Sequence, residues 1–228
     1  MPNSDSPVLL ITGASSGIGA ASARAAAAEG WRVVLAARSK DKIDALAEEL
    51  GGADAALAVT CDVTEWDQQQ AAVAASVDAF GSLDAFFANA GFGASRGFEE
   101  ETPEHWREMI DTNIYGCALS IRAALGQFRK QGTGHMLVTG SGAGRVVMPG
   151  SVYSATKWAV HALGDALRQE VSDTAIKSTI IAPGMVSTPF FENEPKHALQ
   201  ADDVARAVVY ALGQPDGVDI NEVLIRPN

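Results

Sequence analysis

Tyr153 and Lys157 are residue types that together could move a proton, and they stand four positions apart in the sequence YSATK. Residues at i and i+4 share one face of a helix, so a helix here would place a phenol beside an ammonium group. A nearby positive charge favours the phenolate, and we therefore expect the pKa of Tyr153 to lie below its ordinary value of about 10. The same pair also arises by chance, so other residues must decide whether it does chemistry.

A glycine-rich turn near the N-terminus suits a different task, the binding of a phosphate group. An apolar run from Val8 to Ile11 leads directly into TGASSGIG, residues 12–19, where a helix is predicted to begin. Glycines at a strand-to-helix turn let the backbone approach a pyrophosphate, and the helix N-terminus offers free N–H groups. A plain turn is the alternative, but the position straight after the first strand favours a dinucleotide. The expected contacts are Gly13, Ser15, Ser16, Gly17, Ile18 and Gly19.

Polar or glycine-containing pieces also follow three later apolar runs. Ser141 lies just past residues 136–139, Ala90 and Gly91 follow the run 85–89 that ends in Asn89, and a Pro-Gly pair follows residues 178–182. Ligands bind at the carboxyl ends of the strands of a parallel sheet. The pattern therefore predicts that these pieces lie at one edge of such a sheet.

The elements that would position these residues alternate between short apolar runs and longer helical segments. The runs are continuous rather than alternating, which fits strands covered on both faces, and they occupy residues 8–12, 33–37, 56–61, 85–89, 136–139, 178–182 and 222–226. Helical spacing is found, for example, over 20–29, 42–50, 66–80, 113–130 and 151–171. This alternation predicts one α/β domain over residues 1–228, built on a parallel sheet with helices on both faces.

Composition excludes several classes of protein. The 228 residues carry a net charge of −11, which disfavours binding to nucleic acid or to an anionic membrane surface. No apolar run approaches the ~20 residues of a membrane span, and residues 1–7 do not resemble a signal peptide. We therefore expect a cytoplasmic protein. The two cysteines, Cys61 and Cys117, form no C-x-x-C pair, and the histidines match no metal pattern, so no metal site is expected.

Taken together, these pieces resemble the classical short-chain dehydrogenase/reductase family over essentially the whole chain. The resemblance rests on residues 12–19, 61–63, 89–91, Asn113, Ser141, residues 153–157, and residues 183–184 with Thr188. It implies a Rossmann-like, doubly wound parallel sheet of about seven strands, a nicotinamide cofactor and a catalytic tetrad of Asn113, Ser141, Tyr153 and Lys157. Tyr153 would be the general acid and base, Ser141 would orient the substrate oxygen, Lys157 would hold the nicotinamide ribose, and Asn113 would hold a water in a proton relay.

The resemblance also implies further cofactor contacts. Asp62 would meet the adenine, Asn89 the adenine ribose and Thr188 the carboxamide or pyrophosphate. The remaining expected contacts are Val63, Ala90, Gly91, Pro183, Gly184 and Val186. Structural alternatives stay open at this stage: Asn113 could cap a helix, Asp62 could make a turn, and Ser141 could be a loop hydroxyl. His161 is interpreted as a structural residue.

The end of the second strand predicts which cofactor is used. Sites for NAD place Asp or Glu there to bind the ribose 2′-hydroxyl. Counting from Gly13, this position is Ala37, and the next residue is Arg38, whose fork of donors suits a 2′-phosphate. We therefore expect NADP rather than NAD. A solvent-exposed arginine in a turn is the alternative, and Ser16 stands where many NADP-binding relatives carry a basic residue.

The expected substrate pocket is mainly apolar. Phe92, Met148, Met185 and Phe190, with Phe191, follow strand ends or flank Tyr153, and residues 185–200 form a short substrate loop. Arg96 and Arg145 are the cations that could bind a carboxylate. The pattern favours a hydride transfer between nicotinamide and a neutral carbonyl/alcohol substrate. A 3-hydroxy acid or serine-type dehydrogenase is one alternative, and a protein that senses NADP without turnover is the other.

The helix predicted over 151–171 has two apolar sides. One stripe, Val160, Leu163, Leu167 and Val171, should face the sheet. A second stripe consists of small residues, Ala155, Ala159, Ala162 and Ala166. A helix that is apolar on two sides is buried on two sides, which indicates a homodimer or homotetramer; a merely alanine-rich helix is the alternative.

Overall fold

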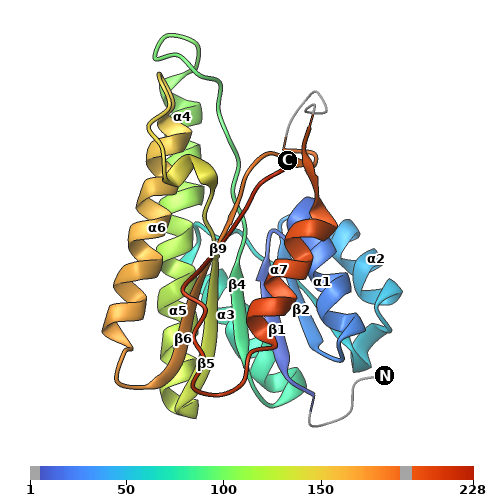
Figure 1. Cartoon of the computed structure of the whole chain (residues 1–228). Helices are drawn as coiled ribbons and strands as arrows, with labels where there is room; N and C mark the ends of the chain where they lie inside the picture. The colour runs from blue at the N-terminus through green and yellow to red at the C-terminus, as the bar shows by residue number, and fades with distance from the viewer. Residues whose placement is uncertain (1–5, 191–196) are drawn as a thin grey trace.

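A computed structural model describes residues 6–190 and 197–228. Its centre is a parallel sheet of seven strands in the order β3-β2-β1-β4-β5-β6-β9 (Figure 1). The strands are β1 (Val8–Thr12), β2 (Arg32–Ala37), β3 (Ala56–Thr60), β4 (Ala85–Ala88), β5 (Thr133–Thr139), β6 (Ala175–Pro183) and β9 (Glu222–Ile225). The α/β Rossmann-like sheet expected from the sequence is confirmed.

Helices cover both faces of this sheet. One face carries α3 (Trp66–Phe80), α5 (Cys117–Gln131) and α6 (Val152–Glu170), and the other carries α1 (Gly17–Ala28), α2 (Lys40–Glu49) and α7 (Ala201–Leu212), as Figure 1 shows. Successive strand residues point to opposite faces, so Leu10 joins the first core and Ile11 the second. This two-sided burial explains why the strands read as continuous apolar runs.

β5 and β6 each begin three residues before the apolar run that predicted them. β5 starts at Thr133 and β6 at Ala175, and the apolar runs begin later because Thr133, His135 and Lys177 interrupt the pattern near these starts. His135 is one of them, and it is buried because its Nε2 pairs with Thr179 Oγ1 of the neighbouring strand at 2.8 Å. A partner across the sheet thus permits a polar residue in the core.

The helix predicted to start at Asn113 begins ten residues earlier. Thr102 caps α4 (Pro103–Ile110) by accepting a hydrogen bond from the His105 N–H, and Pro103 stands in its first turn. The chain then runs without a break through a π-helical turn, η2 (Asp111–Gly116), into α5. Asn113 therefore lies inside a helix and does not cap one, so that structural alternative is wrong.

Short elements connect the larger ones. They are the 3-10 turns η1 (Gly52–Asp54) and η3 (Gly142–Gly144) and a small parallel pair, β7 (Val186–Ser187) with β8 (Leu199–Gln200). The pair joins the two ends of the expected substrate loop. Among the described residues, no helix is long and apolar enough to cross a membrane.

Candidate active site

A cleft of about 420 Å³ opens at the carboxyl ends of the strands. It lies where β1 and β4 are neighbours, the point at which the chain stops adding strands on one side and starts on the other. Such a switch point is the usual ligand site of an open α/β sheet. The predicted residues that line the cleft are Gly13, Ser15, Ser16, Gly17, Ile18, Arg38, Asp62, Val63, Asn89, Ala90, Gly91, Phe92, Ser141, Tyr153, Lys157, Pro183, Gly184, Val186, Thr188 and Phe190.

The turn between β1 and α1 requires its glycines. Gly13 has φ +66°, and a Cβ there would lie 2.9 Å from the Cα of Ala90. A Cβ on Gly19 would lie 2.3 Å from the carbonyl oxygen of Gly13. Gly19 does not line the cleft; its lack of a side chain lets α1 pack against the turn. The turn is therefore bare backbone on its cleft side, which is the surface that a pyrophosphate needs.

Asn89 joins three strand ends. Its Nδ2 donates to the Thr12 carbonyl at 3.1 Å, and its Oδ1 accepts from Thr139 Oγ1 at 3.1 Å. The Thr12 hydroxyl in turn accepts from the N–H groups of Asn89 and Ala90. The Asn89 side chain thus fixes the floor of the cleft, whatever further contact it makes with a ligand.

Asn113 is held in the π-helical turn by three hydrogen bonds. Its amide exchanges hydrogen bonds with the backbone of Phe92, at 3.0 and 2.9 Å, and donates to Thr156 Oγ1 at 3.1 Å. Asn113 is 2% exposed and does not line the cleft. The side chain therefore ties the segment after β4 to α6, and single π turns of this kind often occur at functional sites.

Ser141, Tyr153 and Lys157 meet at one end of the cleft. Ser141 caps η3, and its Oγ accepts from the Ala143 N–H at 3.1 Å. Lys157 Nζ donates to the Thr139 carbonyl at 2.8 Å and lies 5.7 Å from the centre of the Tyr153 ring. Helical spacing thus places the phenol and the ammonium together as predicted, with the serine hydroxyl beside them.

The expected direction of the Tyr153 pKa is wrong. Burial raises the pKa of Tyr153 to about 12, and a hydrogen bond with the Ser141 side chain opposes this rise. Burial also lowers the pKa of Lys157 to about 8. The Tyr–Lys spacing alone could not reveal this, because the loss of hydration depends on the elements that pack around the pair.

At the other end of the cleft, Arg38 is exposed and Asp62 faces it. Asp62 Oδ1 accepts from the backbone N–H and the hydroxyl of Thr64, at 3.0 and 2.8 Å, so the turn weighed as an alternative is present. Burial acts to raise the pKa of Asp62, but these hydrogen bonds and the charge of Arg38 hold it below its usual range. Lys40, in contrast, pairs with Asp44 at 2.5 Å.

The predicted substrate residues divide into two groups. Phe92 and Phe190 line the cleft, and the Phe190 ring lies edge-on to Tyr153 with their centroids 5.6 Å apart. Met148 and Met185 do not line it, because Met148 sits in the loop after η3 and Met185 is 41% exposed. Phe191 lies outside the described residues. Neither Arg96 nor Arg145 lines the cleft, and Arg145 pairs with Glu222.

Sequence reasoning missed several lining residues. Thr112 precedes Asn113 in the π turn, Thr139 ends β5, and Gly93 lies under Phe190, whose ring would be 2.7 Å from a Cβ there. Thr139 could have been found, since it is the last residue of a predicted strand. Gly93 carried no such signal, because its contact depends on a residue 97 positions later in the chain.

The cleft fits a dinucleotide on the chemistry of its walls. Bare glycine backbone lies at the start of α1, a cation at the end of β2, and a buried lysine beside a tyrosine at the far end. Within residues 6–190 and 197–228, no group of three or more His, Cys, Asp or Glu could hold a metal ion.

Comparison with known proteins agrees with this geometry. The family model described as short chain dehydrogenase matches residues 7–198. The chain belongs to the classical short-chain dehydrogenase/reductase family. It is an NAD(P)-dependent oxidoreductase, as members of this family are, and it is 42% identical to an uncharacterized oxidoreductase of Staphylococcus haemolyticus, over 96% of each chain.

Solved structures of three oxidoreductases have the same fold. An alcohol dehydrogenase of Thermococcus sibiricus complexed with 5-hydroxy-NADP is 33% identical, with a TM-score of 0.89 over 98% of this chain and 97% of that one. A 3-ketoacyl-(acyl-carrier-protein) reductase of Brucella melitensis complexed with NADH is 30% identical, with a TM-score of 0.89 over 98% of each chain. A serine dehydrogenase of Escherichia coli is 30% identical, with a TM-score of 0.87 over 96% of each chain.

Proposed function

We propose that this short-chain dehydrogenase/reductase interconverts a neutral carbonyl compound and its alcohol, with NADP(H) as the favoured cofactor. The observation that carries the reaction type is the convergence of Ser141, Tyr153 and Lys157 at one end of the dinucleotide cleft. A pure sensor of NADP would need no such group of proton donors, so the arrangement favours turnover.

In this proposal the protein moves the proton. The Tyr153 hydroxyl donates it to the substrate oxygen during reduction and takes it back during oxidation, and the Ser141 hydroxyl donates a hydrogen bond to the same oxygen. A bound nicotinamide supplies or accepts the hydride. Lys157 holds the nicotinamide ribose, and burial keeps Tyr153 in its protonated form. Asn113 keeps the π turn and the Phe92 backbone in place around this group.

The proposed substrate is neutral because of the walls around Tyr153. Phe92 and Phe190 are apolar, and the arginines that could recognise a carboxylate do not line the cleft among the described residues. The likeness to a serine dehydrogenase keeps a 3-hydroxy acid or serine-type substrate as the second candidate. A strong preference for carboxylate substrates that is lost in Arg96→Ala would favour that candidate.

A screen of aldehydes and ketones with NADPH, and of alcohols with NADP⁺, tests the reaction. The absorbance of the nicotinamide reports turnover. In Tyr153→Phe the ring remains and the proton is lost. We expect turnover to fall by about 10²–10⁴-fold, the usual contribution of a positioned acid or base, while cofactor binding measured by fluorescence stays nearly unchanged. Near-full activity of this variant would refute Tyr153 as the acid.

The choice of NADP rests on Arg38. This side chain is exposed at the end of β2, lines the cleft, and has no carboxylate at Ala37 beside it to repel a 2′-phosphate. Loss of one charge-assisted hydrogen bond costs about 1.5–3 kcal/mol, or about ten- to a hundred-fold in affinity. Arg38→Ala should therefore raise KM for NADPH by about that factor and leave KM for NADH nearly unchanged. Equal use of NADH and NADPH by the unmutated protein would contradict the assignment.

We also propose that the protein forms a homodimer or homotetramer. The sheet-facing stripe of α6 is buried as predicted, with Val160, Leu167 and Val171 in the core. On the opposite side of α6, Ala155, Ala162 and Ala166 are exposed and Trp158 is 45% exposed. An apolar helix face of small residues with one large aromatic is suited to close contact with another copy of the chain.

A further inference from the structure

His161 is a buried histidine that the proposed reaction does not use. It stands one turn after Lys157 in α6 and is 3% exposed. Its ring lies in a space left by two glycines on either side of Ser141. A Cβ on Gly140 would lie 2.5 Å from His161 Nε2, and a Cβ on Gly144 would lie 2.7 Å from its Cδ2. The glycines of this stretch therefore make room for the imidazole.

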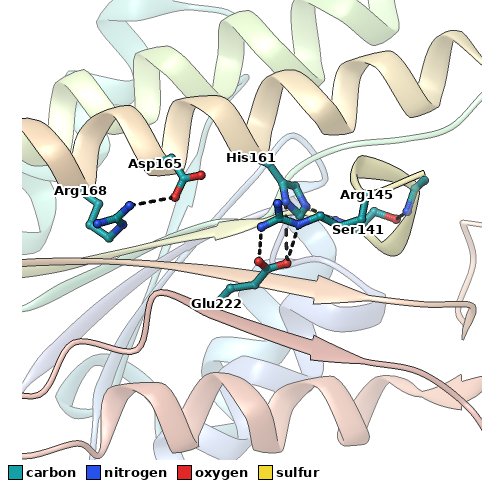
Figure 2. Close-up of polar contacts among 7 residues, drawn as sticks. Ser141, Arg145, His161, Asp165, Arg168 and Glu222 are labelled. Atoms are coloured by element: carbon teal, nitrogen blue, oxygen red, sulfur yellow. Dashed lines mark hydrogen bonds and ion pairs between the residues drawn. The ribbon is translucent and has the colours of Figure 1, made fainter. Parts of the chain in front are cut away.

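The imidazole binds the backbone of Ser141. The Ser141 N–H donates to His161 Nε2 at 3.2 Å (Figure 2). Ser141 lies beyond the end of β5, where its N–H has left the strand ladder, and the histidine provides the acceptor instead. Because Nε2 accepts, the ring is neutral and its proton sits on Nδ1.

Nδ1 of His161 faces Glu222, which lies in β9 at the edge of the sheet. The distance from Nδ1 to Glu222 Oε1 is 3.8 Å, too long for a hydrogen bond but short enough for the carboxylate to favour the Nδ1–H tautomer. Glu222 is itself held by Arg145, which follows η3, as Figure 2 shows. The histidine thus lies between a carboxylate on one side and the Ser141 backbone on the other.

Two hydrogen bonds consequently fix Ser141 at both ends. Its N–H is bound by His161, and its Oγ accepts from the Ala143 N–H within η3. The hydroxyl hydrogen remains available to point toward Tyr153, with which the Ser141 side chain forms a hydrogen bond. A shift of Ser141 by even about 1 Å would misplace a group that must reach the substrate oxygen.

We propose that His161 is a positioning residue of the active site, whose neutral imidazole anchors the Ser141 backbone so that the serine hydroxyl meets the substrate oxygen. This inference rests on the proposed function of Ser141. Protonation at Nε2 removes the acceptor and sets two N–H groups against each other, so an acidic solution releases the anchor.

Burial and the charges around His161 set the pH at which the imidazole gains its proton and the anchor is lost. Burial lowers the pKa of His161 below its ordinary value; the Glu222 carboxylate acts to raise it, and the charges of Arg145 and Lys157 act to lower it. Because burial prevails, the imidazole gains its proton at a lower pH than an ordinary histidine does. The anchor is present above that pH and is lost as the pH falls through the pKa of the folded protein.

Two variants of His161 test this inference. His161→Leu fills the space without an acceptor, and we expect kcat to fall about five- to a hundred-fold, the effect of one hydrogen bond, with the Kd of NADPH nearly unchanged. In His161→Gln the amide oxygen can lie near the position of Nε2. We expect this variant to recover most of the lost kcat at pH 7 and to lose the acid limb that His161 gives the kcat–pH profile of the unmutated protein.

Thermal unfolding shows whether both variants fold. A glutamine variant that is folded but as slow as the leucine variant would overturn the inference, and so would an acid limb that persists in it. An ¹⁵N NMR titration of the unmutated protein needs no substrate and separates this inference from the proposed function. It should show the Nδ1–H tautomer at pH 7 with a pKa below 6.5, and an Nε2–H tautomer would refute the anchor even if the enzyme reduces carbonyls.

Discussion

Individual residues at this site owe their chemistry to burial as much as to their neighbours. Tyr153 and Lys157 lie close together, yet burial pushes the pKa of the phenol up to about 12 and that of the ammonium down to about 8. Both shifts favour the neutral form of the group, because the surrounding chain removes the water that would stabilise its charge. The protein therefore keeps Tyr153 protonated across the physiological range, as a general acid for reduction requires.

The pKa of Lys157 predicts how activity changes in alkaline solution. Its positive charge is present below about pH 8 and is lost as the pH rises above that value. Because kcat/KM reports the ionisation of the free enzyme, we expect kcat/KM for NADPH to fall as the pH rises through about 8. Lys157→Met should have a low kcat/KM at every pH and no transition near 8. An unchanged alkaline transition in this variant would assign it to another group.

At the scale of elements, the turn between β1 and α1 requires glycine at the positions where its main chain contacts other main-chain atoms. Gly13 and Gly19 bring the turn against Ala90 and against itself, and no larger residue fits without a shift of main-chain atoms. Other glycines have no such contact. Gly126, in the exposed middle of α5, would place a Cβ in open space.

Substitution of these two kinds of glycine by alanine should change the stability of the protein in opposite directions. Gly19→Ala puts a Cβ 2.3 Å from the Gly13 carbonyl oxygen, so we expect a lower Tm and at least ten-fold weaker NADPH binding. Gly126→Ala removes only backbone freedom and should add about 1 kcal/mol to the free energy of unfolding, or about 2–4 °C in Tm. Thermal unfolding and fluorescence titration measure both. Tolerance of alanine at position 19 would refute the tight turn.

At the scale of the molecule, one end of the sheet gathers every group that the proposed reaction needs. Strand order brings β1 and β4 together although 72 residues lie between the end of β1 and the start of β4. The outer face of α6 lies at one side of this assembly, and α2 lies at the other (Figure 1). Within the described residues, the outer face of α6 carries exposed alanines around a large exposed aromatic, Trp158, whereas α2 contains no aromatic residue.

Two variants that replace an alanine by glutamate test the proposed oligomer. Ala162→Glu places a charge on the outer face of α6, which would be buried in a dimer, and we expect it to lower the mass measured by light scattering. Ala45→Glu places the same charge on an exposed position of α2 and should leave the mass unchanged. If the unmutated protein is a monomer, or if both variants lower the mass alike, the α6 interface is wrong.

The sequence by itself determined the strands, most helices and the glycine turn, which follow from local patterns because a buried strand and a strand-to-helix turn are each visible within a few residues. The proposed tetrad is not a local pattern; it is implied by the resemblance of several separated motifs to one family. It placed helix boundaries less well around Asn113, because the π turn joins two segments whose patterns differ.

Only the tertiary structure decided what depends on distant contacts. The raised pKa of Tyr153 reflects burial by several elements, the exclusion of Met148 and Met185 from the cleft reflects the path of their loops, and Arg145 is paired with a residue 77 positions away. His161 is the clearest case. Its sequence neighbours show only a histidine in a helix, whereas the fold places Ser141 and Glu222 on either side of its ring. Local patterns fix which elements form, but the environment of a side chain is set by segments that meet only when the chain has folded.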